Sequence, residues 1–377
     1  MTKIYLSSLY NYDGKSIFDL DYTQKTTKIK MLTDFNNNIL KWENNKCRCS
    51  YKEDLVLSMR DRRGFKVRTV LCMNCGLIRA DPRISEETVD IFYEKYYRNL
   101  VPLVHNEIGE NLISATYNKE KKHGKKVLEF IKRNTLLKNG LTFDFGAGTG
   151  GMLKIFENAG FEIFGVDLNE TFLNYGLKKG LNLKKGSIDE LKNYSKKANL
   201  IIASHILEHL HSLDKYLRKL WECLEDEGYL YVELPGFYNV HRTFKNFLPF
   251  FLIEHFYYFT LSTLSKVLGE NGFKLIAGNE TISALFQKSS KKHNIRISKD
   301  YIENILIYLR IVDIPLPINV CKVIYNKKKM KYKIILTIIS IIYKTRFIDF
   351  VAFLKLFAKK NIKRGKLIKL VKSITQN

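Results

Sequence analysis

The sequence lacks the features that would place the chain in a membrane or outside a cell. No apolar run reaches the ~20 residues that a membrane-spanning helix needs. The longest strongly apolar stretch without a charge is Ile334–Tyr343, and Lys344 follows it at once. The first twenty residues mix polar and aromatic side chains and contain no apolar core of an export signal. Six cysteines in 377 residues are too few for a secreted disulfide scaffold. We therefore expect a cytoplasmic protein with reduced thiols.

Acidic residues are scarce as well, and unevenly so, because 38 Asp and Glu stand against 63 Lys and Arg, a net charge of +25. Residues 281–377 hold 22 basic residues against 4 acidic ones, whereas residues 1–280 hold 41 against 34. From residue 322 onward lysine clusters alternate with Ile, Leu and Phe, which is typical of basic amphipathic helices. This pattern favours an anionic membrane surface as partner, at its inner face, or a solvated helical pair packed on the rest of the chain. Nucleic acid is a weaker candidate, because no recognised RNA- or DNA-reading module accompanies the charge.

The chain has no internal repeat, and its patterns divide it into four parts. Residues 1–46 form an N-terminal segment without a clear period. Residues 47–105 contain two cysteine pairs and a helix that Ser85 should cap. Residues 106–290 alternate between helical and strand patterns, and residues 291–377 form the basic helical extension.

Two closely spaced cysteine pairs mark the second part of the chain. Four thiols near one another in a reducing setting point to a tetrahedral zinc site, and Gly76 allows the tight turn after the second pair. The predicted ligands are Cys47, Cys49, Cys72 and Cys75. The first pair has a single intervening residue, so reduced thiols in a degenerate site remain the alternative. We interpret Cys223 and Cys321 as packing residues.

The third part predicts an α/β fold with a doubly wound, parallel sheet. A basic amphipathic helix over 118–132 leads into a strand over 141–145, and helices and strands then alternate. The further expected strands are 161–167, one that ends at 187, 200–203, 229–234, 273–277 and 282–286, and the further expected helices are 152–158, 171–178, 213–224 and 261–270.

A glycine-rich turn after the first of these strands carries the strongest functional signal. Asp144 precedes Gly146, Gly148 and Gly150, where glycines allow a bound ligand to approach the backbone and the acid can receive a cationic amine. Asp167 ends the next strand, where a carboxylate can accept both hydroxyls of a ribose. Gly146, Gly148 and Gly151 also satisfy G-x-G-x-x-G, so a nicotinamide cofactor is the alternative ligand. The acid before the first glycine, the preceding helix and the downstream segments favour S-adenosylmethionine.

From about residue 110 to 290 the chain resembles the class I methyltransferases with the motif D-x-G-x-G-x-G. The likeness includes Leu207-Glu208-His209-Leu210 after the fourth strand, and it departs from the family at Asn199, where the family usually has an aspartate that acts as a structural cap. The resemblance implies a Rossmann-like fold and binding of the methyl donor. The implied donor-binding residues are Asp144, Gly146, Gly148, Gly150, Asp167, Leu168, Ser187, Ile188 and Ser204.

The segment His205-Ile206-Leu207-Glu208-His209 also satisfies H-x-x-E-H, a zinc-peptidase pattern. Two histidines at this spacing share one helix face and could hold a metal ion. Because the segment follows a buried strand of a methyltransferase-like framework, we interpret it as a helix start. His205 is then a candidate for the methyl-donor pocket, and His209 for structural hydrogen bonds.

The cysteine module and Glu254-His255-Phe256-Tyr257-Tyr258-Phe259 together resemble the sugar C-methyltransferases. The resemblance implies a sugar substrate, nucleotide-linked or in a surface glycan, and His255 as the base with Glu254 beside it or in its place. The family has a tyrosine where this chain has Leu252, and its C-terminal domain has no counterpart in residues 290–377. The remaining alternatives are an RNA methyltransferase, a nicotinamide-dependent sugar oxidoreductase and a donor-binding protein without activity.

Overall fold

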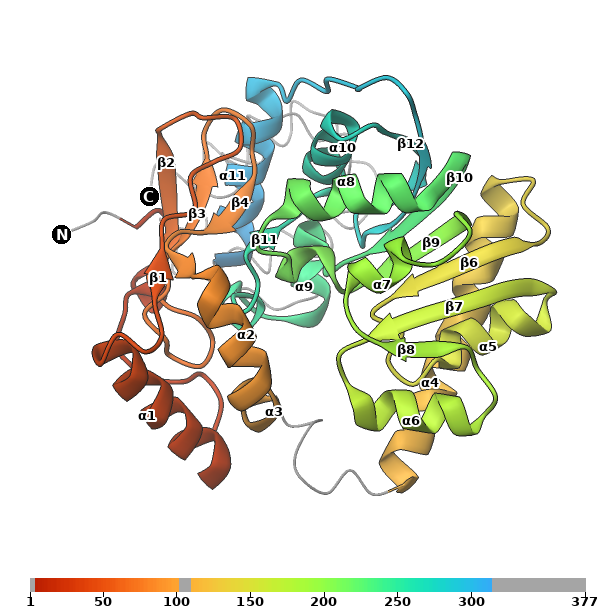
Figure 1. Cartoon of the computed structure of the whole chain (residues 1–377). Coiled ribbons are helices and arrows are strands. Elements are labelled where there is room, and N and C mark those ends of the chain that lie inside the picture. The colour runs from red at the N-terminus through yellow and green to blue at the C-terminus, as the bar shows by residue number, and fades with distance from the viewer. Residues whose placement is uncertain (1–3, 102–109, 314–377) are drawn as a thin grey trace, which may run out of the picture.

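The computed structural model describes residues 4–101 and 110–313 (Figure 1). The predicted basic amphipathic helices beyond residue 322 lie outside this range. Among the described residues, no helix combines the length and the apolar character needed to cross a bilayer.

A seven-stranded sheet forms the larger half of the molecule (Figure 1). The strand order is β12-β13-β10-β9-β6-β7-β8. β9 lies at the centre, and Leu200, Ile201 and Ile202 are fully buried because helices cover both faces of the sheet. The strands are β6 (Gly140–Phe145), β7 (Phe161–Asp167), β8 (Leu183–Lys185), β9 (Ala198–Ser204), β10 (Leu224–Glu233), β12 (Phe273–Gly278) and β13 (Ser283–Lys288).

The sheet is mixed, and the prediction of a wholly parallel sheet is wrong at one strand. β13 runs antiparallel to both of its neighbours, β10 and β12. The cause is the connection between β12 and β13, which spans only residues 279–282. Four residues can close a hairpin, but a parallel pair needs a crossover of a dozen residues or more.

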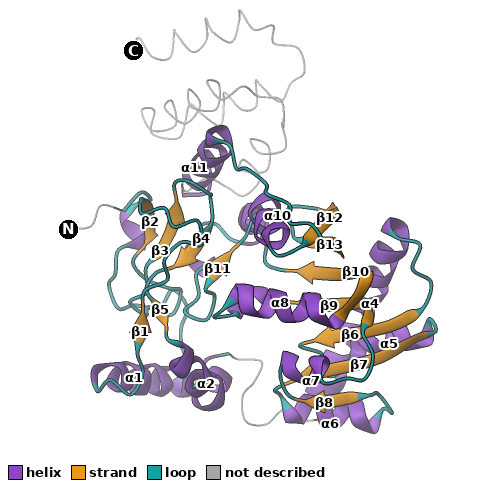
Figure 2. Ribbon diagram, turned by 45° about the horizontal axis from the view of Figure 1, so that its top comes forward, coloured by secondary structure: helices purple, strands orange, loops and turns teal. Residues whose placement is uncertain are grey.

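Helices cover the two faces of this sheet in separate layers (Figure 2). One face packs against α4 (Glu110–Asn134), α5 (Gly151–Asn158) and α6 (Glu170–Lys178) through one apolar cluster. The other face packs against α7 (Ile188–Lys192), α8 (Leu213–Cys223) and α10 (Leu261–Glu270) through a second cluster. These helices agree with the predicted ones to within two residues, except for α4, which begins earlier, and α7, a single short turn that was not predicted.

The N-terminal half is built around a smaller sheet whose strand order is β11-β4-β3-β2. Its strands are antiparallel, and a further short pair joins the two remaining strands. The strands of this half are β1 (Trp42–Glu43), β2 (Asp54–Ser58), β3 (Thr69–Cys72), β4 (Ile78–Ala80), β5 (Arg83–Ile84) and β11 (Tyr257–Tyr258). The helices are α1 (Tyr22–Asn36), α2 (Glu86–Lys95) and α3 (Tyr97–Leu100), with a 3-10 turn at Ser8–Tyr10.

Two helices of this half test the sequence analysis in different ways. The side chain of Ser85 accepts a hydrogen bond from the Thr88 amide and caps α2, as predicted. α1 begins with a capping box formed by Asp21 and Gln24, in the segment that the sequence left unassigned. The buried side chains of α1 include Gln24 and Thr27, so the helix shows no apolar stripe that a periodicity search would find.

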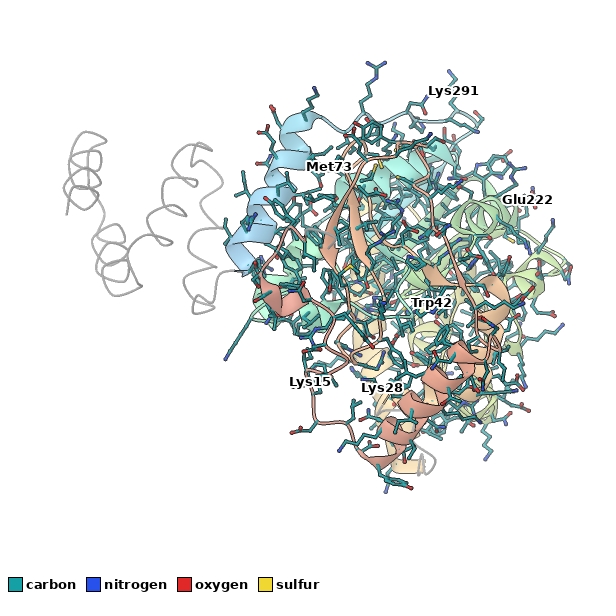
Figure 3. The ribbon with its side chains drawn as sticks, turned by 90° about the vertical axis from the view of Figure 1, so that its left-hand side faces the viewer. Lys15, Lys28, Trp42, Met73, Glu222 and Lys291 are labelled. Carbon is teal, nitrogen blue, oxygen red and sulfur yellow. The ribbon has the colours of Figure 1, made fainter. Side chains whose placement is uncertain are left out.

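Segments far apart in sequence hold the two halves together. β11 comes from the late part of the chain, yet Tyr257 and Tyr258 pair with Arg79 and Ile78 of β4. The helix α11 (Lys299–Asp313) packs on the same sheet and buries Ile305 against its apolar cluster. Seen from the N-terminal half, α11 runs along the edge of the molecule (Figure 3). The short helical turns of the late segment are η3 (Leu207–His209), η4 (Phe237–Asn239), α9 (Val240–Thr243) and η5 (Leu248–Phe250).

Candidate active site

The glycine-rich turn lies between β6 and α5, as predicted. Gly146, Gly148 and Gly150 have φ angles of 90°, 56° and 76°, a left-handed conformation that side chains disfavour. A Cβ atom on Gly146 would lie 2.4 Å from the Ile206 side chain. The turn therefore requires glycine for its backbone conformation and, at Gly146, for space as well.

Asp167 at the end of β7 is joined directly to this turn. Its Oδ2 accepts a hydrogen bond of 2.8 Å from the Gly148 amide, and its Oδ1 accepts one of 2.7 Å from the Asn169 amide. Gly148, in the turn after β6, and Asp167, at the end of β7, are both predicted to bind the donor and are in direct contact. Burial raises the pKa of Asp167, and these hydrogen bonds oppose the rise.

Asp144 lies in the same group of acids. The residue is only 2% exposed, and burial, then the charges of Glu120 and Asp167, raise its pKa well above the usual range. A buried group of carboxylates is stabilised by a cationic ligand. S-adenosylmethionine carries an amine and a sulfonium, so the acids of this site fit the predicted donor.

The other predicted donor residues are distributed along the ends of the sheet. Leu168 is 63% exposed directly after Asp167. Ser187 caps α7, and the Ile188 side chain is fully buried in the core. The Ser204 hydroxyl, at the end of β9, donates to Glu233 at 3.3 Å. Leu168 is the most open of these side chains, and Ile188 is closed to a ligand in this conformation.

Glu120 is a site residue that the sequence analysis missed. It reaches from α4 to the glycine-rich turn, where its carboxylate accepts hydrogen bonds from the amides of Thr149 at 3.3 Å and Gly151 at 2.9 Å and from the Thr149 hydroxyl. It therefore caps α5, whose own N-cap residue, Gly150, has no side chain. Only an acidic residue on a helix before the motif could have signalled this role.

A second missed pair lies one helical turn further along α4. His123 Nε2 is 2.6 Å from the Glu233 carboxylate at the end of β10. Burial raises the pKa of Glu233, but His123 outweighs it and the net effect is a lowered pKa. The His205 amide donates to the Glu233 carbonyl at 2.8 Å. His123, Glu233 and His205 thus meet at the carboxyl ends of the strands, where α/β sheets bind ligands.

Glu254 and His255 lie at the boundary between the two halves. The Glu254 carboxylate is 3% exposed and bound by the Arg63 guanidinium, with three nitrogen–oxygen distances of 2.8–3.0 Å. Burial raises the pKa of Glu254, but Arg63 outweighs it and the net effect is a lowered pKa. His255 is also buried, and burial, then the charge of His209, holds its pKa well below the usual range. His255 is therefore neutral at pH 7.

The H-x-x-E-H segment does not form the helix that the peptidase pattern needs. His205 has a left-handed φ of 57°, and a short 3-10 turn over Leu207–His209 follows it. The two histidines therefore do not share the face of an α-helix. Glu208 and His209 lie beside His255 instead, with one oxygen or nitrogen atom of each residue within 4.8 Å of the others.

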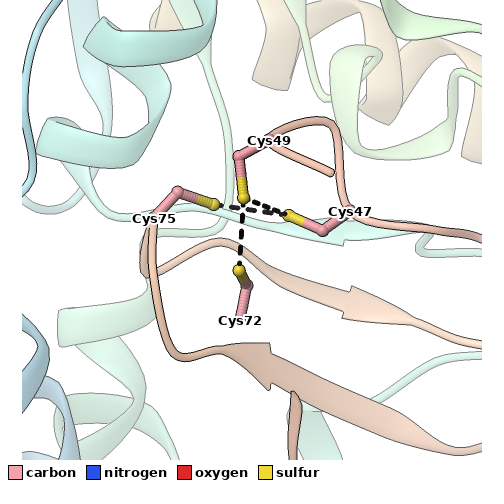
Figure 4. A group of neighbouring side chains, drawn as sticks. All are labelled: Cys47, Cys49, Cys72 and Cys75. Atoms are coloured by element: carbon pink, nitrogen blue, oxygen red, sulfur yellow. Dashed lines mark hydrogen bonds between the residues drawn. The ribbon is translucent and has the colours of Figure 1, made fainter. Parts of the chain in front are cut away.

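The four predicted zinc ligands come together (Figure 4). The Sγ atoms of Cys47 and Cys75 are 3.4 Å apart, and that of Cys49 lies 3.5 Å from those of Cys47 and Cys72. A zinc ion bound at about 2.3 Å by four thiolates would hold their sulfurs at similar separations. Cys223 is buried in the core, as predicted, and Cys321 lies outside the described residues.

The cysteine module is also tied to the larger half by charge. Arg48, between the first two thiols, places its Nη2 2.7 Å from Asp214 of α8 and 3.1 Å from Glu270 of α10. The Arg48 side chain is 17% exposed. The loop that carries the thiols is thereby fixed against two helices of the larger half.

Comparisons with known proteins agree with this architecture. Residues 117–277 match the family model described as "Methyltransferase domain". The C-methyltransferase NovU of Streptomyces niveus is 24% identical over 160 residues, which are 41% of this chain and 38% of that protein. This chain thus spans well under half the length of that relative. The segment that is similar to a methyltransferase domain lies in the larger half of the molecule.

The chain is similar to several solved structures, and two of them contain methyltransferases. One is an S-adenosylmethionine-dependent methyltransferase of Clostridium acetobutylicum, with 16% identity and a TM-score of 0.38 over 48% of this chain and 99% of that one. The other is the complex of the Haloferax volcanii Trm112 methyltransferase activator with a putative methyltransferase, with 14% identity and a TM-score of 0.38 over 45% of this chain and 76% of that one.

Proposed function

We propose that this protein is an S-adenosylmethionine-dependent methyltransferase that acts on a sugar, either nucleotide-linked or part of a surface glycan. The observation that carries the donor assignment is the contact between the glycine-rich turn and Asp167, made beside the buried Asp144. The family model that matches residues 117–277 supports the same chemistry. With this activity the protein would belong to nucleotide-sugar metabolism or polysaccharide biosynthesis.

The sugar assignment rests on the Glu254-His255 segment, the cysteine module and the partial likeness to a C-methyltransferase. The structure adds that the two residues border the cysteine module, since β11 follows them directly and pairs with β4. The site thus joins a donor region in one half to basic and aromatic groups contributed by the other. This combination of groups from both halves suits a large, polar acceptor molecule such as a sugar.

In this proposal His255 takes the proton of the acceptor. A bound S-adenosylmethionine supplies the electrophilic methyl group. The neutral imidazole of His255 removes a proton from a hydroxyl or from a carbon next to a carbonyl. The freed electron pair forms the new bond to the methyl group as the methyl–sulfur bond breaks and S-adenosylhomocysteine leaves. Glu254 is the weaker candidate, because Arg63 occupies its carboxylate. His205 is the next candidate, because its ring is 56% exposed at the end of β9.

The direct test is transfer of an isotopically labelled methyl group. The protein is incubated with labelled S-adenosylmethionine and panels of nucleotide-sugars, lipid-linked glycans and RNA, and the products are read by mass spectrometry. Label in a sugar supports the proposal, and the labelled atom distinguishes C- from O-methylation. Label in RNA alone would replace the proposal with an RNA methyltransferase. Donor binding without label in any acceptor would favour a non-catalytic protein, and a shift in Tm with NAD alone would favour an oxidoreductase.

We further propose that Cys47, Cys49, Cys72 and Cys75 hold one structural zinc ion. Elemental analysis of protein purified without added metal should find about one equivalent, which Cys72→Ser should remove. Cys223→Ser, a change at a buried thiol of α8, is the matched control and should keep the metal. Well-folded protein without metal would contradict the assignment.

The basic segment beyond residue 322 is proposed to bind an anionic membrane surface, which would place the enzyme at the inner face of the membrane beside lipid-linked glycans. Each Lys or Arg close to such a surface contributes about 1 kcal/mol, and salt screens the attraction. Full-length protein should sediment with anionic vesicles at low salt, and protein without residues 322–377 should not. Equal sedimentation of both forms would disprove this role.

A further inference from the structure

A buried carboxylate without a hydrogen-bond partner lies between the proposed catalytic residues. Glu208 is 2% exposed, and among the residues that the structure describes neither of its carboxylate oxygens has a hydrogen-bond partner. Burying a charged carboxylate without compensation costs several kcal/mol. A positive charge beside this carboxylate would offset that cost.

Three imidazoles surround the same carboxylate. Its Oε1 lies 3.5 Å from Nδ1 of His205 and 3.9 Å from Nε2 of His209. A ring nitrogen of His255 belongs to the group whose atoms lie within 4.8 Å of one another. At 3.5 and 3.9 Å a protonated His205 or His209 would form an ion pair with Glu208, and an imidazolium at His255, within 4.8 Å, would be attracted by its charge without direct contact. Three neutral rings would leave the carboxylate uncompensated.

The hydrogen bonds of His209 show why it does not satisfy Glu208 by itself. Its Nδ1 is 3.1 Å from the Glu254 carbonyl oxygen and 3.0 Å from the Tyr93 hydroxyl. A carbonyl oxygen only accepts, so this contact assigns the proton of the neutral ring to Nδ1. The Nε2 lone pair then faces the Glu208 oxygen, which leaves the carboxylate available for a proton that arrives from elsewhere.

The other charged groups of the cluster are already paired or cannot help. The Arg63 guanidinium is taken by Glu254, and the pKa values of Tyr93 and Tyr97 are raised, chiefly by burial, so both phenols stay neutral. Charged and titratable groups face the cluster from several neighbouring elements. They are Arg62 and Arg63 from the loop after β2, Tyr93 and Tyr97 from α2 and α3, Lys119 from α4, His205 and Glu233 from the ends of β9 and β10, and Glu254 and His255 before β11.

We propose that Glu208 is a positioning residue that stabilises the imidazolium of His255 and directs its proton to His205. This inference rests on the proposed role of His255 as the base. The acceptor loses one proton to His255, Glu208 balances the positive charge while it exists, and the proton leaves through the exposed ring of His205 to water. His255 returns to its neutral form, so no oxidant or further reactant is needed.

The environment of His255 explains why the base needs such a partner. Burial lowers its pKa, and the charges of His209, Arg62, His205 and Arg63 lower it further. Forming an imidazolium there is unfavourable unless a negative charge is close. Desolvation also lowers the pKa of His205, but Glu208 outweighs it and the net effect is a raised pKa. His205 is therefore the better final holder of the proton.

The side chain of Glu208 can be changed without removing its structural contact. The Glu208 carbonyl oxygen accepts a hydrogen bond of 2.8 Å from the Phe256 amide and so ties η3 to the segment before β11. Glu208→Gln keeps this backbone contact and the side-chain volume while it removes the charge. Glu208→Asp keeps the charge with a shorter reach.

The test measures the protonation of the histidines as well as turnover. NMR titration of the imidazole resonances, assigned with His205→Gln and His255→Gln, is compared between wild type and Glu208→Gln. We expect the midpoints of His205 and His255 to fall by about 1–3 pH units in Glu208→Gln. Glu208→Asp should return them toward wild type, and the surface change Glu129→Gln should leave them unaltered. Unchanged midpoints in folded Glu208→Gln protein, judged by Tm, would overturn the proposal.

Steady-state kinetics with an acceptor that the wild-type protein methylates provide the second measurement. Glu208→Gln should lower kcat about 10–100-fold, as expected for weakened acid–base catalysis, and leave KM and donor affinity nearly unchanged. The acidic limb of the kcat profile should move to lower pH in this variant. Metal that stays bound in Cys72→Ser protein and is lost when Glu208→Gln is added would instead make the cluster a metal site and overturn the proposal. If wild type methylates no acceptor, the proposed function fails while the NMR result still decides the role of Glu208.

Discussion

The proposed donor region and the proposed acceptor region of this molecule are built in different ways. Asp144, the glycine-rich turn and Asp167 come from two successive strands, so a short stretch of sequence contains the whole donor motif. The acceptor region joins distant segments, since Arg63 and Glu254 are 191 residues apart and Tyr93 and His209 are 116 apart. Site residues that are close together in the sequence form a recognisable motif. Site residues that only folding brings together are scattered along the sequence and form no motif.

The largest expected effect separates the two regions by function. His255→Ala should lower turnover by 10²–10⁴-fold, because a positioned general base typically contributes that much. Donor binding measured by calorimetry should survive, since the donor region is built from other strands. His293→Ala, a change far along the chain beyond β13, is the control and should keep wild-type turnover. Equal rates for both variants would remove His255 from the mechanism.

The next effect tests whether the acceptor region depends on the pairing of the two halves. Arg63→Ala leaves Glu254 buried and uncompensated, which should cost about 3–5 kcal/mol of the free energy of unfolding. Arg133→Ala, at an exposed pair on α4, should change stability by less than about 1 kcal/mol. Denaturant unfolding of both variants measures the difference. Similar losses of stability in the two variants would mean that the Arg63–Glu254 pair does not stabilise the contact between the two halves.

The same ion pair predicts a pH dependence. The pKa of Glu254 in the folded protein is lowered, so its stabilising contribution is present above the unfolded pKa, about 4.3, and is lost as pH falls through the folded value. Wild type should therefore lose stability below about pH 4.3 through this group. In Arg63→Ala, burial without the guanidinium raises the folded pKa of Glu254 above the unfolded value, so the sign reverses and this group should add stability as pH falls. Urea midpoints measured from pH 3 to 7 show whether the two curves separate in this way.

A smaller effect tests the donor region. Asp167→Ala removes the acceptor of the Gly148 amide and the proposed partner of the ribose, and should weaken donor binding by about 1–3 kcal/mol. Asp226→Ala, whose side chain is 97% exposed, is the control and should leave affinity unchanged. Calorimetry with S-adenosylmethionine measures both, and unchanged affinity in Asp167→Ala would refute the ribose assignment.

The smallest effect concerns the side chain that couples α4 to the donor turn. Glu120→Gln weakens the cap of α5 and should cost about 1 kcal/mol of stability. Glu129→Gln on the same helix, with an exposed side chain, should cost less. A Tm change that is equal in the two variants would show that Glu120 does not stabilise the turn.

The sequence predicted the elements whose signals are local. β7 and α10 have the predicted bounds. Asn199, which stands where the family that the chain resembles usually has an aspartate, accepts a hydrogen bond of 2.9 Å from the Leu141 amide. The antiparallel direction of β13 was missed, although the predicted strands 273–277 and 282–286 already leave only four residues between them, too few for a parallel crossover. α1 was missed because its buried face is partly polar.

The missed site residues share a different cause. Glu120, His123 and Arg63 are charged or polar residues in segments that look like solvent-exposed surface, and only packing brings them to the strand ends and to Glu254. The four cysteines were found because their spacing is a signal in itself, although two pairs still had to be joined by folding. The periodicity of a segment does not show which of its charged residues will be buried against a partner that is distant in the sequence.

The pairing of β11 with β4 has a consequence for how the chain folds. β4 ends at residue 80 and its edge stays unpaired until Tyr257 and Tyr258 have been synthesised, about 180 residues later. At 5–20 residues per second, the ribosome needs roughly 10–35 s to cover that distance. During this interval the nascent module presents an open strand edge, the kind of surface that recruits chaperones or pairs with another chain. A fragment that ends after α3 keeps this open edge permanently and should therefore aggregate where the full chain does not.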